Sequence, residues 1–234
     1  MVSNSSVDWE DYATERILTR NRLVKAHHRA VTRVLVDWFA AEDTSQSFLE
    51  IGCGDGFWLD LLRNLGVQRI KGIDVSLHYV KICQAKGHDV ECCSFADYTP
   101  SVLYDWVYLI DVLEHLDDPR AALDNILQKV RPGGKILVVT PVYESIVGRA
   151  QRAITGVSKL SQAQKQDPTH IQAFSSNEVR TFLESAGCRT VKCTYAASFT
   201  RLYGLKLRLL NTIAQNLTFG GRTGDQFLIV ARKI

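Results

Sequence analysis

The stretch Phe48-Leu49-Glu50-Ile51-Gly52-Cys53-Gly54-Asp55-Gly56-Phe57-Trp58 decides how the rest of this chain is organised. Its first four residues favour a β-strand, and the three glycines that follow are separated by single residues. Apolar residues then recur at helical spacing until Gly66: Trp58, Leu61, Leu62 and Leu65. The pattern predicts a strand, a tight glycine turn and a helix.

Glycines in such a turn affect both the backbone conformation and the access of a ligand. Glycine permits positive φ angles and lets a ligand lie directly against the backbone. The first turn of the following helix offers N–H groups that no helical carbonyl accepts. These features are typical of nucleotide-binding turns, but a glycine-rich turn without a ligand has the same residues. The turn alone leaves both interpretations open.

The second predicted strand, residues 69–75, carries an acidic residue at its carboxyl end. Asp74 follows the glycine turn at the spacing at which dinucleotide-binding folds hold a ribose hydroxyl. A carboxylate can accept hydrogen bonds from both ribose hydroxyls. The glycines run G-x-G-x-G instead of G-x-G-x-x-G, so a nicotinamide dinucleotide fits less well than another nucleoside cofactor.

At this point the chain resembles the class I S-adenosylmethionine-dependent methyltransferases. Their first motif is E/D-x-G-x-G-x-G, and their second strand ends in an acidic residue. The residues that match are Glu50, Gly52, Gly54, Gly56 and Asp74. The resemblance covers residues 48–234 and leaves only the N-terminal helices outside it.

Strands and helices alternate along the chain after the glycine turn. Further strands are predicted at residues 89–94, 104–110 and 134–140, and the helix before the last of these is expected to run from Pro119 to Val130. Such alternation predicts a parallel sheet with right-handed crossovers. The resemblance implies a doubly wound α/β fold: a mostly parallel seven-stranded sheet of order 3-2-1-4-5-7-6, with the last strand antiparallel and helices on both faces.

A chain of 234 residues, 46% of them hydrophobic, is long enough to bury a full core as one domain, residues 1–234. Residues 1–44 are expected to form N-terminal helices and residues 45–140 the cofactor-binding core. Residues 141–174 and 198–225 are longer than simple connections require. Both follow carboxyl ends of strands, so they are expected to roof the active site.

Composition and charge restrict the environment and the partners. A net charge of +3 is too small to indicate nucleic-acid binding. The six cysteines form no C-x-x-C pair, and no apolar run is long enough to span a bilayer, so a cytoplasmic location is expected. Residues 198–217 resemble a basic amphipathic helix, which favours a lid over the active site and leaves weak membrane-surface contact as the alternative.

The resemblance also assigns the cofactor, S-adenosylmethionine, and the residues around it. The glycines of the turn would approach its methionine part, Asp74 its ribose and Asp97 its adenine, although Asp97 could equally be an exposed turn residue. Ile110 and Asp111 would line the floor beneath the sulfonium. The full expected set is Glu50, Gly52, Cys53, Gly54, Gly56, Asp74, Val75, Asp97, Tyr98, Ile110 and Asp111.

Methyl transfer from a sulfonium is an in-line displacement, so much of its rate can come from alignment. A hydroxyl acceptor must still lose its proton, to a histidine, to a carboxylate or through a metal. His115 follows the fourth strand, and His170 lies in the roofing segment, in Asp167-Pro168-Thr169-His170. These two histidines are the predicted catalytic residues.

The stretch Asp111-Val112-Leu113-Glu114-His115 invites a closer comparison. It resembles the E-x-x-E-H metal-binding motif of ubiquinone-biosynthesis O-methyltransferases and of small-RNA 2′-O-methyltransferases, with Asp111 in place of the first glutamate. Asp111, Glu114, His115 and His170 could form an oxygen-and-nitrogen divalent site. Alternatively, Asp111 lines the cofactor pocket, Glu114 packs against or caps the following turn, and His115 lines the cleft, so no metal is assigned.

The sequence thus predicts a methyltransferase of the ubiquinone-biosynthesis type that acts on a small molecule, at an oxygen atom. RNA 2′-O-methylation is one alternative, but the chain has no basic stripe with interleaved aromatic residues. A protein that binds the cofactor without catalysis is the other alternative. Nucleic acid is therefore not expected as a partner.

Overall fold

The structure, a computed structural model, describes residues 22–144, 153–164, 167–196 and 226–234. The first part of the predicted N-terminal helices lies outside these residues. So does the whole predicted insertion 198–225, and with it the expected amphipathic helix. Among the described residues, no helix has both the length and the hydropathy needed to cross a bilayer.

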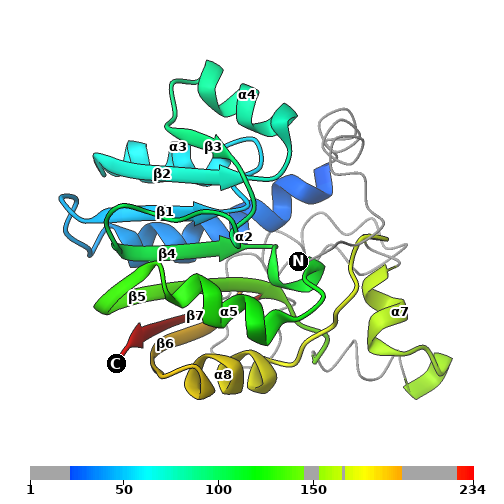
Figure 1. Ribbon diagram of the computed structural model, residues 1–234. Helices are drawn as coiled ribbons and strands as arrows, with labels where there is room; N and C mark the ends of the chain where they lie inside the picture. The colour runs from blue at the N-terminus through cyan, green and yellow to red at the C-terminus, as the bar shows by residue number, and fades with distance from the viewer. Residues whose placement is uncertain (1–21, 145–152, 165–166, 197–225) are drawn as a thin grey trace.

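Seven strands form one sheet in the order β3-β2-β1-β4-β5-β7-β6 (Figure 1), which confirms the predicted order. Strands β1 to β5 pair in parallel, and β7 runs antiparallel to both β5 and β6. The strands are β1 (Ser47–Ile51), β2 (Arg69–Asp74), β3 (Val90–Cys92), β4 (Tyr104–Ile110), β5 (Val130–Pro141), β6 (Cys188–Ala196) and β7 (Gln226–Lys233).

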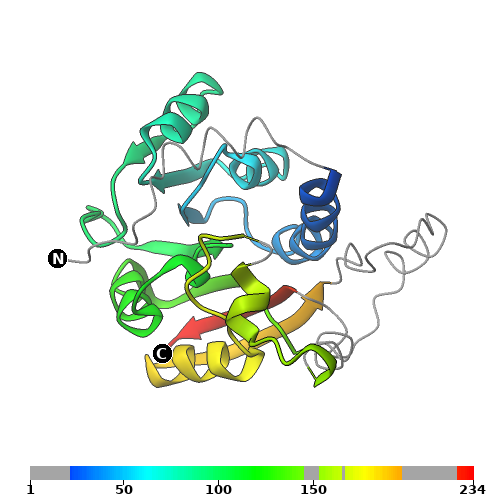
Figure 2. The ribbon, with the colours of Figure 1, turned by 90° about the vertical axis from the view of Figure 1, so that its right-hand side faces the viewer.

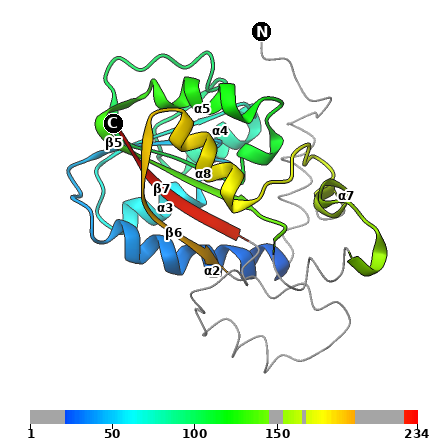
Figure 3. The same cartoon turned by 90° about the horizontal axis from the view of Figure 1, so that it is seen from below.

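Helices cover both faces of the sheet, as predicted (Figure 3). One face carries α2 (Arg22–Phe39) and α3 (Phe57–Asn64), and the other carries α5 (Pro119–Leu127) and α8 (Ser176–Ser185). Helix α4 (Leu77–Ala85) shares a smaller apolar cluster with residues of α3 and β3.

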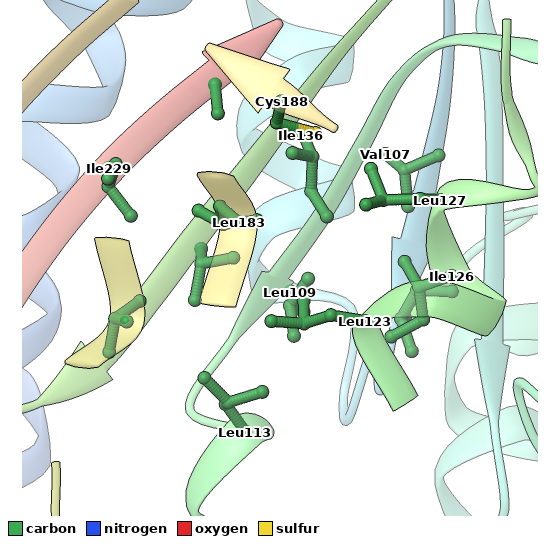
Figure 4. Close-up of a cluster of buried hydrophobic side chains, with 14 of the residues drawn as sticks. Val107, Leu109, Leu113, Leu123, Ile126, Leu127, Ile136, Leu183, Cys188 and Ile229 are labelled. Carbon is green, nitrogen blue, oxygen red and sulfur yellow. The ribbon is translucent and has the colours of Figure 1, made fainter. Parts of the chain in front are cut away.

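The core has one large apolar cluster on each face. Figure 4 shows the first, in which Leu123 and Ile126 of α5 and Leu183 of α8 surround Leu109 of β4. On the other face, Val31 and Leu35 of α2 lie in the same buried cluster as Trp58 and Leu62 of α3. Residues 106–110 of β4 are buried throughout, as expected of a central strand that helices cover on both faces.

The predicted boundary between α5 and β5 was wrong. The helix ends at Leu127, and Val130 begins the strand by pairing with Tyr104 instead of continuing the inward face of the helix. The register of β4 with β5 shifts between Tyr104 and Trp106, and Gly133 adopts φ +73°. An irregular strand can therefore contain residues 131–133, which were expected to separate a helix ending at Val130 from a strand beginning at Gly134.

The carboxyl ends of β1, β2 and β4 point to the same edge of the sheet (Figure 1). Helix α7 (Lys159–Gln164) lies beyond this edge, and Figure 2 views the molecule from this side. The chain then returns toward α8, where Val142 and Phe174 form an isolated parallel bridge. The described part of the predicted roofing segment 141–174 therefore lies beside the strand ends.

Candidate active site

The glycine turn between β1 and α3 has the backbone that its sequence predicts. Gly52, Gly54 and Gly56 have φ angles of +70°, +51° and +81°, a region that favours glycine. The N–H groups of Gly52 and Cys53 donate to the carbonyl of Ile73 at 2.8 and 3.1 Å, which ties the turn to β2. Of the three glycines, Gly54 alone would carry a Cβ with no atom within 4 Å, so its backbone is open to a ligand.

Asp74, the last residue of β2, turns its carboxylate toward the glycine turn. One oxygen accepts the Gly54 N–H at 2.8 Å and the other accepts the Ser76 N–H at 2.9 Å. The residue is only 8% exposed. These two bonds orient the carboxylate toward the glycine turn, and a carboxylate can accept further hydrogen bonds such as those of sugar hydroxyls.

Helix α4 and the residue after it hold the turn from behind. The Cys83 thiol donates to the Gly54 carbonyl at 3.2 Å, and the Lys86 ammonium donates to the Asp55 carbonyl at 2.6 Å. Lys86 also pairs with Asp60 at 3.1 Å. No sequence pattern pointed to Cys83 or Lys86 as supports of the turn, because their contacts depend on how α4 packs against it.

Glu50 of β1 is a buried carboxyl group, only 1% exposed. The Tyr108 hydroxyl donates to its Oε2 at 3.0 Å, whereas its Oε1 has no hydrogen-bond partner among the described residues. Burial raises the pKa of Glu50 well above its ordinary value, and the Tyr108 hydrogen bond opposes this only in part. A buried polar atom without a partner fits a site that receives a polar ligand.

Asp97, predicted to contact the adenine, and Tyr98, also predicted to contact the cofactor, lie in different surroundings. Asp97 is exposed, and its carboxylate accepts the Ser94 hydroxyl of its own turn at 2.6 Å. The Tyr98 hydroxyl lies 2.7 Å from that of Tyr104, the first residue of β4, at the opposite end of that strand from Asp111. The Tyr98 hydroxyl therefore lies away from the strand ends that carry the glycine turn, and the contact of Asp97 and Tyr98 with the cofactor stays a prediction.

The other predicted cofactor residues fall at or near strand ends. Val75 directly follows Asp74 and is 49% exposed, whereas Cys53 and Ile110 are buried in the core. Asp111 follows β4, and its N–H donates to the Val139 carbonyl at 2.9 Å. It is the one non-glycine residue with positive φ in the described parts of the chain, at +55°. Such strain is often found at functional sites.

The two predicted catalytic histidines lie side by side. His115 ends a short 3-10 helix, η1 (Leu113–His115), just beyond β4, and His170 comes from the segment after α7. Their ring centroids are 4.9 Å apart at an interplanar angle of 64°. The N–H groups of Ile171 and Gln172 both donate to the Glu114 carbonyl at 3.1 Å, which fixes the later segment against η1.

The Glu114 carboxyl group lies beside the two histidines. It is 1% exposed, its Oε2 accepts the Thr140 hydroxyl at 3.0 Å, and its Oε1 lies 3.9 Å from Nε2 of His170. Burial and then the nearby charge of Asp111 raise the pKa of Glu114 well above its ordinary value. One ligand atom each of Glu114, His115 and His170 lies within 4.8 Å of the others. This group contains three of the four possible metal ligands that the sequence suggested, without Asp111.

Comparison with known sequences agrees with this geometry. A sequence profile described as a methyltransferase domain matches residues 20–192, well over half of the chain. A ubiquinone biosynthesis O-methyltransferase from Bradyrhizobium sp. is 33% identical over 98 residues, 39% of this chain and 38% of that protein. Another from Paraburkholderia xenovorans is 22% identical over 201 residues, 81% of this chain and 79% of that protein. The chain thus matches less than half the length of the first of these relatives.

Solved structures share the fold. A chain from the complex between the Haloferax volcanii Trm112 methyltransferase activator and a methyltransferase is 18% identical, with a TM-score of 0.69 over 96% of this chain and 97% of that one. Magnesium protoporphyrin IX methyltransferase from Synechocystis, solved with bound SAH, is 15% identical, with a TM-score of 0.66 over 91% and 86%. Because the profile covers well over half of the chain, the chain belongs to the methyltransferase domain family, and its sheet order and glycine motif agree with the fold expected of class I S-adenosylmethionine-dependent methyltransferases.

Proposed function

We propose that this protein transfers the methyl group of S-adenosylmethionine to an oxygen atom of a small-molecule acceptor, with His115 and His170 beside that acceptor. The pairing of the two imidazoles at the strand ends, 4.9 Å apart, is the observation that carries the proposal. Imidazole is the usual general base near neutral pH. The names of the ubiquinone biosynthesis O-methyltransferases also favour oxygen as the methylated atom.

In this proposal some residues bind the cofactor and others contact the acceptor. The glycine turn and Asp74 hold the cofactor, which supplies an activated methyl group. The open backbone at Gly54 and the orientation of the Asp74 carboxylate support this assignment. His115 would accept the proton of the acceptor hydroxyl, and the methyl group that passes to the acceptor oxygen would leave its donor as S-adenosylhomocysteine. Aligning the two reactants in this way can supply a large part of the rate.

A labelled-methyl assay tests the proposal. The full chain is incubated with S-adenosylmethionine labelled on its methyl group and with separate panels of small hydroxyl compounds, small amines and RNA. We expect label on hydroxyl compounds, and His115→Ala should lower turnover about 100-fold, the lower range for loss of a general base. Affinity for the cofactor should not change, and Arg189→Ala, at an exposed position of β6, should behave like the wild type.

The other outcomes separate the alternatives. Label on amines alone would contradict O-methylation, and label on RNA would instead support 2′-O-methylation of nucleic acid. Cofactor binding without transfer to any panel or to a cell extract would favour a non-catalytic binding protein. The expected cytoplasmic location and the membrane contact of residues 198–217 stay predictions.

A second candidate is the same transfer assisted by a divalent cation. One carboxylate and two imidazoles suit a transition-metal ion, and Oε1 of Glu114, which has no hydrogen-bond partner within the described parts of the chain, fits a ligand atom. Glu114, His115 and His170 would hold the ion, which would supply Lewis acidity to the acceptor hydroxyl.

Calorimetric titration of the chelator-treated protein with Mn²⁺ tests this candidate. One saturable site that is lost in Glu114→Gln and kept in Glu178→Gln, a substitution in the exposed cap of α8, would support it. Activity that resists chelators, together with no saturable heat, would exclude it.

A further inference from the structure

Asp167, Pro168, Thr169 and His170 form a tight turn beside the two histidines. The His170 N–H donates to the Asp167 carbonyl at 3.1 Å, and aspartate followed by proline favours such a turn. Oδ1 of Asp167 accepts both the N–H and the hydroxyl of Thr169, at 3.0 and 2.5 Å. Asp167 is buried, at 6% exposure. Both polar groups of Thr169 that donate are therefore held by one carboxylate.

Thr169 also meets His115. Nδ1 of His115 lies 3.2 Å from the Thr169 carbonyl oxygen and 3.1 Å from its Oγ1. A carbonyl oxygen can only accept a hydrogen bond, and the single hydroxyl hydrogen of Thr169 is directed to Asp167, since a carboxylate can only accept. Both oxygens facing Nδ1 are thus acceptors, so Nδ1 must carry the hydrogen.

We propose that Asp167 and Thr169 are positioning residues that hold His115 in the tautomer with its proton on Nδ1, so that Nε2 presents the lone pair that receives the proton of the methyl acceptor. Asp167 acts through Thr169, because it orients the threonine hydroxyl away from the histidine. The same tautomer is required for a His115 that binds a cation through Nε2. The inference therefore holds for either form of the proposed function.

In this arrangement the segment that contains residues 167–172 positions both histidines. The turn that supplies His170 also supplies the two oxygens that orient His115, and the backbone of Ile171 and Gln172 fixes the turn to Glu114. A neutral imidazole that carries its hydrogen on Nε2 cannot accept a proton at that nitrogen. The expected effect of the tautomer on turnover rests on the proposed function. The inference that the His115 hydrogen is on Nδ1 does not.

Nitrogen-15 NMR of the metal-free full chain near pH 8 measures the tautomer directly, with His115→Gln used to identify the His115 signals. In the wild type and in Thr169→Ser, which keeps the hydroxyl, Nδ1 should show the shift of a protonated nitrogen and Nε2 that of an unprotonated one. In Asp167→Ala and Thr169→Val, the share of the other tautomer should rise. Protonation of Nε2 in the wild type would overturn the proposal.

Turnover gives a second, separate readout. Asp167→Ala and Thr169→Val should lower kcat roughly threefold to tenfold, the range for one lost hydrogen bond, with an unchanged Kd for S-adenosylmethionine. Thr169→Ser, which keeps the hydroxyl, should keep the kcat of the wild type. If the tautomer shifts but no methyl acceptor is found, the proposed function fails and the positioning role stands. If both variants fold and neither the tautomer nor kcat changes, the positioning role is wrong.

Discussion

At the scale of single residues, Asp74 connects the glycine turn with the end of β2. Its two oxygens each accept one backbone N–H, from the glycine turn and from the start of the next loop. The sequence predicted that an acidic residue would stand at the end of the second strand. It could not show that the same carboxylate also orients the turn, because that contact depends on the register of β1 with β2.

Replacement of Asp74 tests this role. Asp74→Ala should weaken binding of S-adenosylmethionine by about an order of magnitude or more, since charge-assisted hydrogen bonds to the sugar and the anchor of Gly54 are both lost. Isothermal titration calorimetry measures the affinity. Asp89→Ala is the matched control, because that aspartate is exposed and pairs with Lys71. Equal affinities for Asp74→Ala and the wild type would remove Asp74 from the site.

Glu50 predicts a pH effect on stability. Its pKa is raised in the folded state above the ordinary 4.5, so above pH 4.5 the unfolded chain releases this proton more readily than the folded one. The free energy of unfolding should therefore fall as pH rises from 4.5 toward the folded pKa. Glu50→Gln keeps an acceptor for Tyr108 and does not titrate, so its fall should be smaller. Urea unfolding at several pH values measures this, and equal slopes in the two proteins would contradict the raised pKa.

At the scale of elements, the glycine turn combines strain with an open backbone. Gly54 and Gly133 both have positive φ, +51° and +73°, and a Cβ at either would meet no atom within 4 Å. They differ in position, since Gly54 lies beside Asp74 and Gly133 lies within β5. The pair therefore separates the cost of the backbone conformation from the cost of filling a ligand site.

Alanine at these two positions should have different effects. Both Gly54→Ala and Gly133→Ala should lose about 1–2 kcal/mol of stability, because alanine is strained at positive φ. Only Gly54→Ala should also lose affinity for S-adenosylmethionine, because its methyl group occupies space that the cofactor needs. Chemical unfolding and calorimetry measure the two effects. Similar cofactor affinity in the two variants would mean that the cofactor does not approach Gly54.

The elements that could be predicted are those marked by residues close together in the sequence. Strand β1 and helix α3 were predicted correctly because the apolar periodicity and the glycines that mark their ends lie within a few positions of each other. The start of β5 at Val130 was missed because it depends on pairing with Tyr104, a residue distant in sequence. The contact of Thr169 with His115 was missed for the same reason.

At the scale of the whole molecule, the parallel sheet brings the site together. Residues from the ends of β1, β2 and β4 and from the segment after α7 meet at one edge, although they are far apart in sequence. The sequence placed most of them at strand ends, so the edge could be predicted. The tertiary position of Tyr98 could not, because its hydroxyl turns toward Tyr104 at the other end of β4.

Binding at this edge should stabilise the whole domain. At a cofactor concentration 100 times the Kd, the full chain should gain about 2.7 kcal/mol of unfolding free energy, because the ligand binds only the folded state. Thermal unfolding with and without S-adenosylmethionine measures the gain, and Gly54→Ala should gain less at the same concentration. No shift in the wild type at saturating cofactor would contradict an intact binding site.

A crystal structure of the full chain with bound S-adenosylhomocysteine tests the central claim most directly. We expect the product to lie against the backbone of Gly54, with its ribose hydroxyls on the Asp74 carboxylate and its sulfur facing His115 and His170. Density for the ligand elsewhere, or Asp74 without contact to the ribose, would contradict the account.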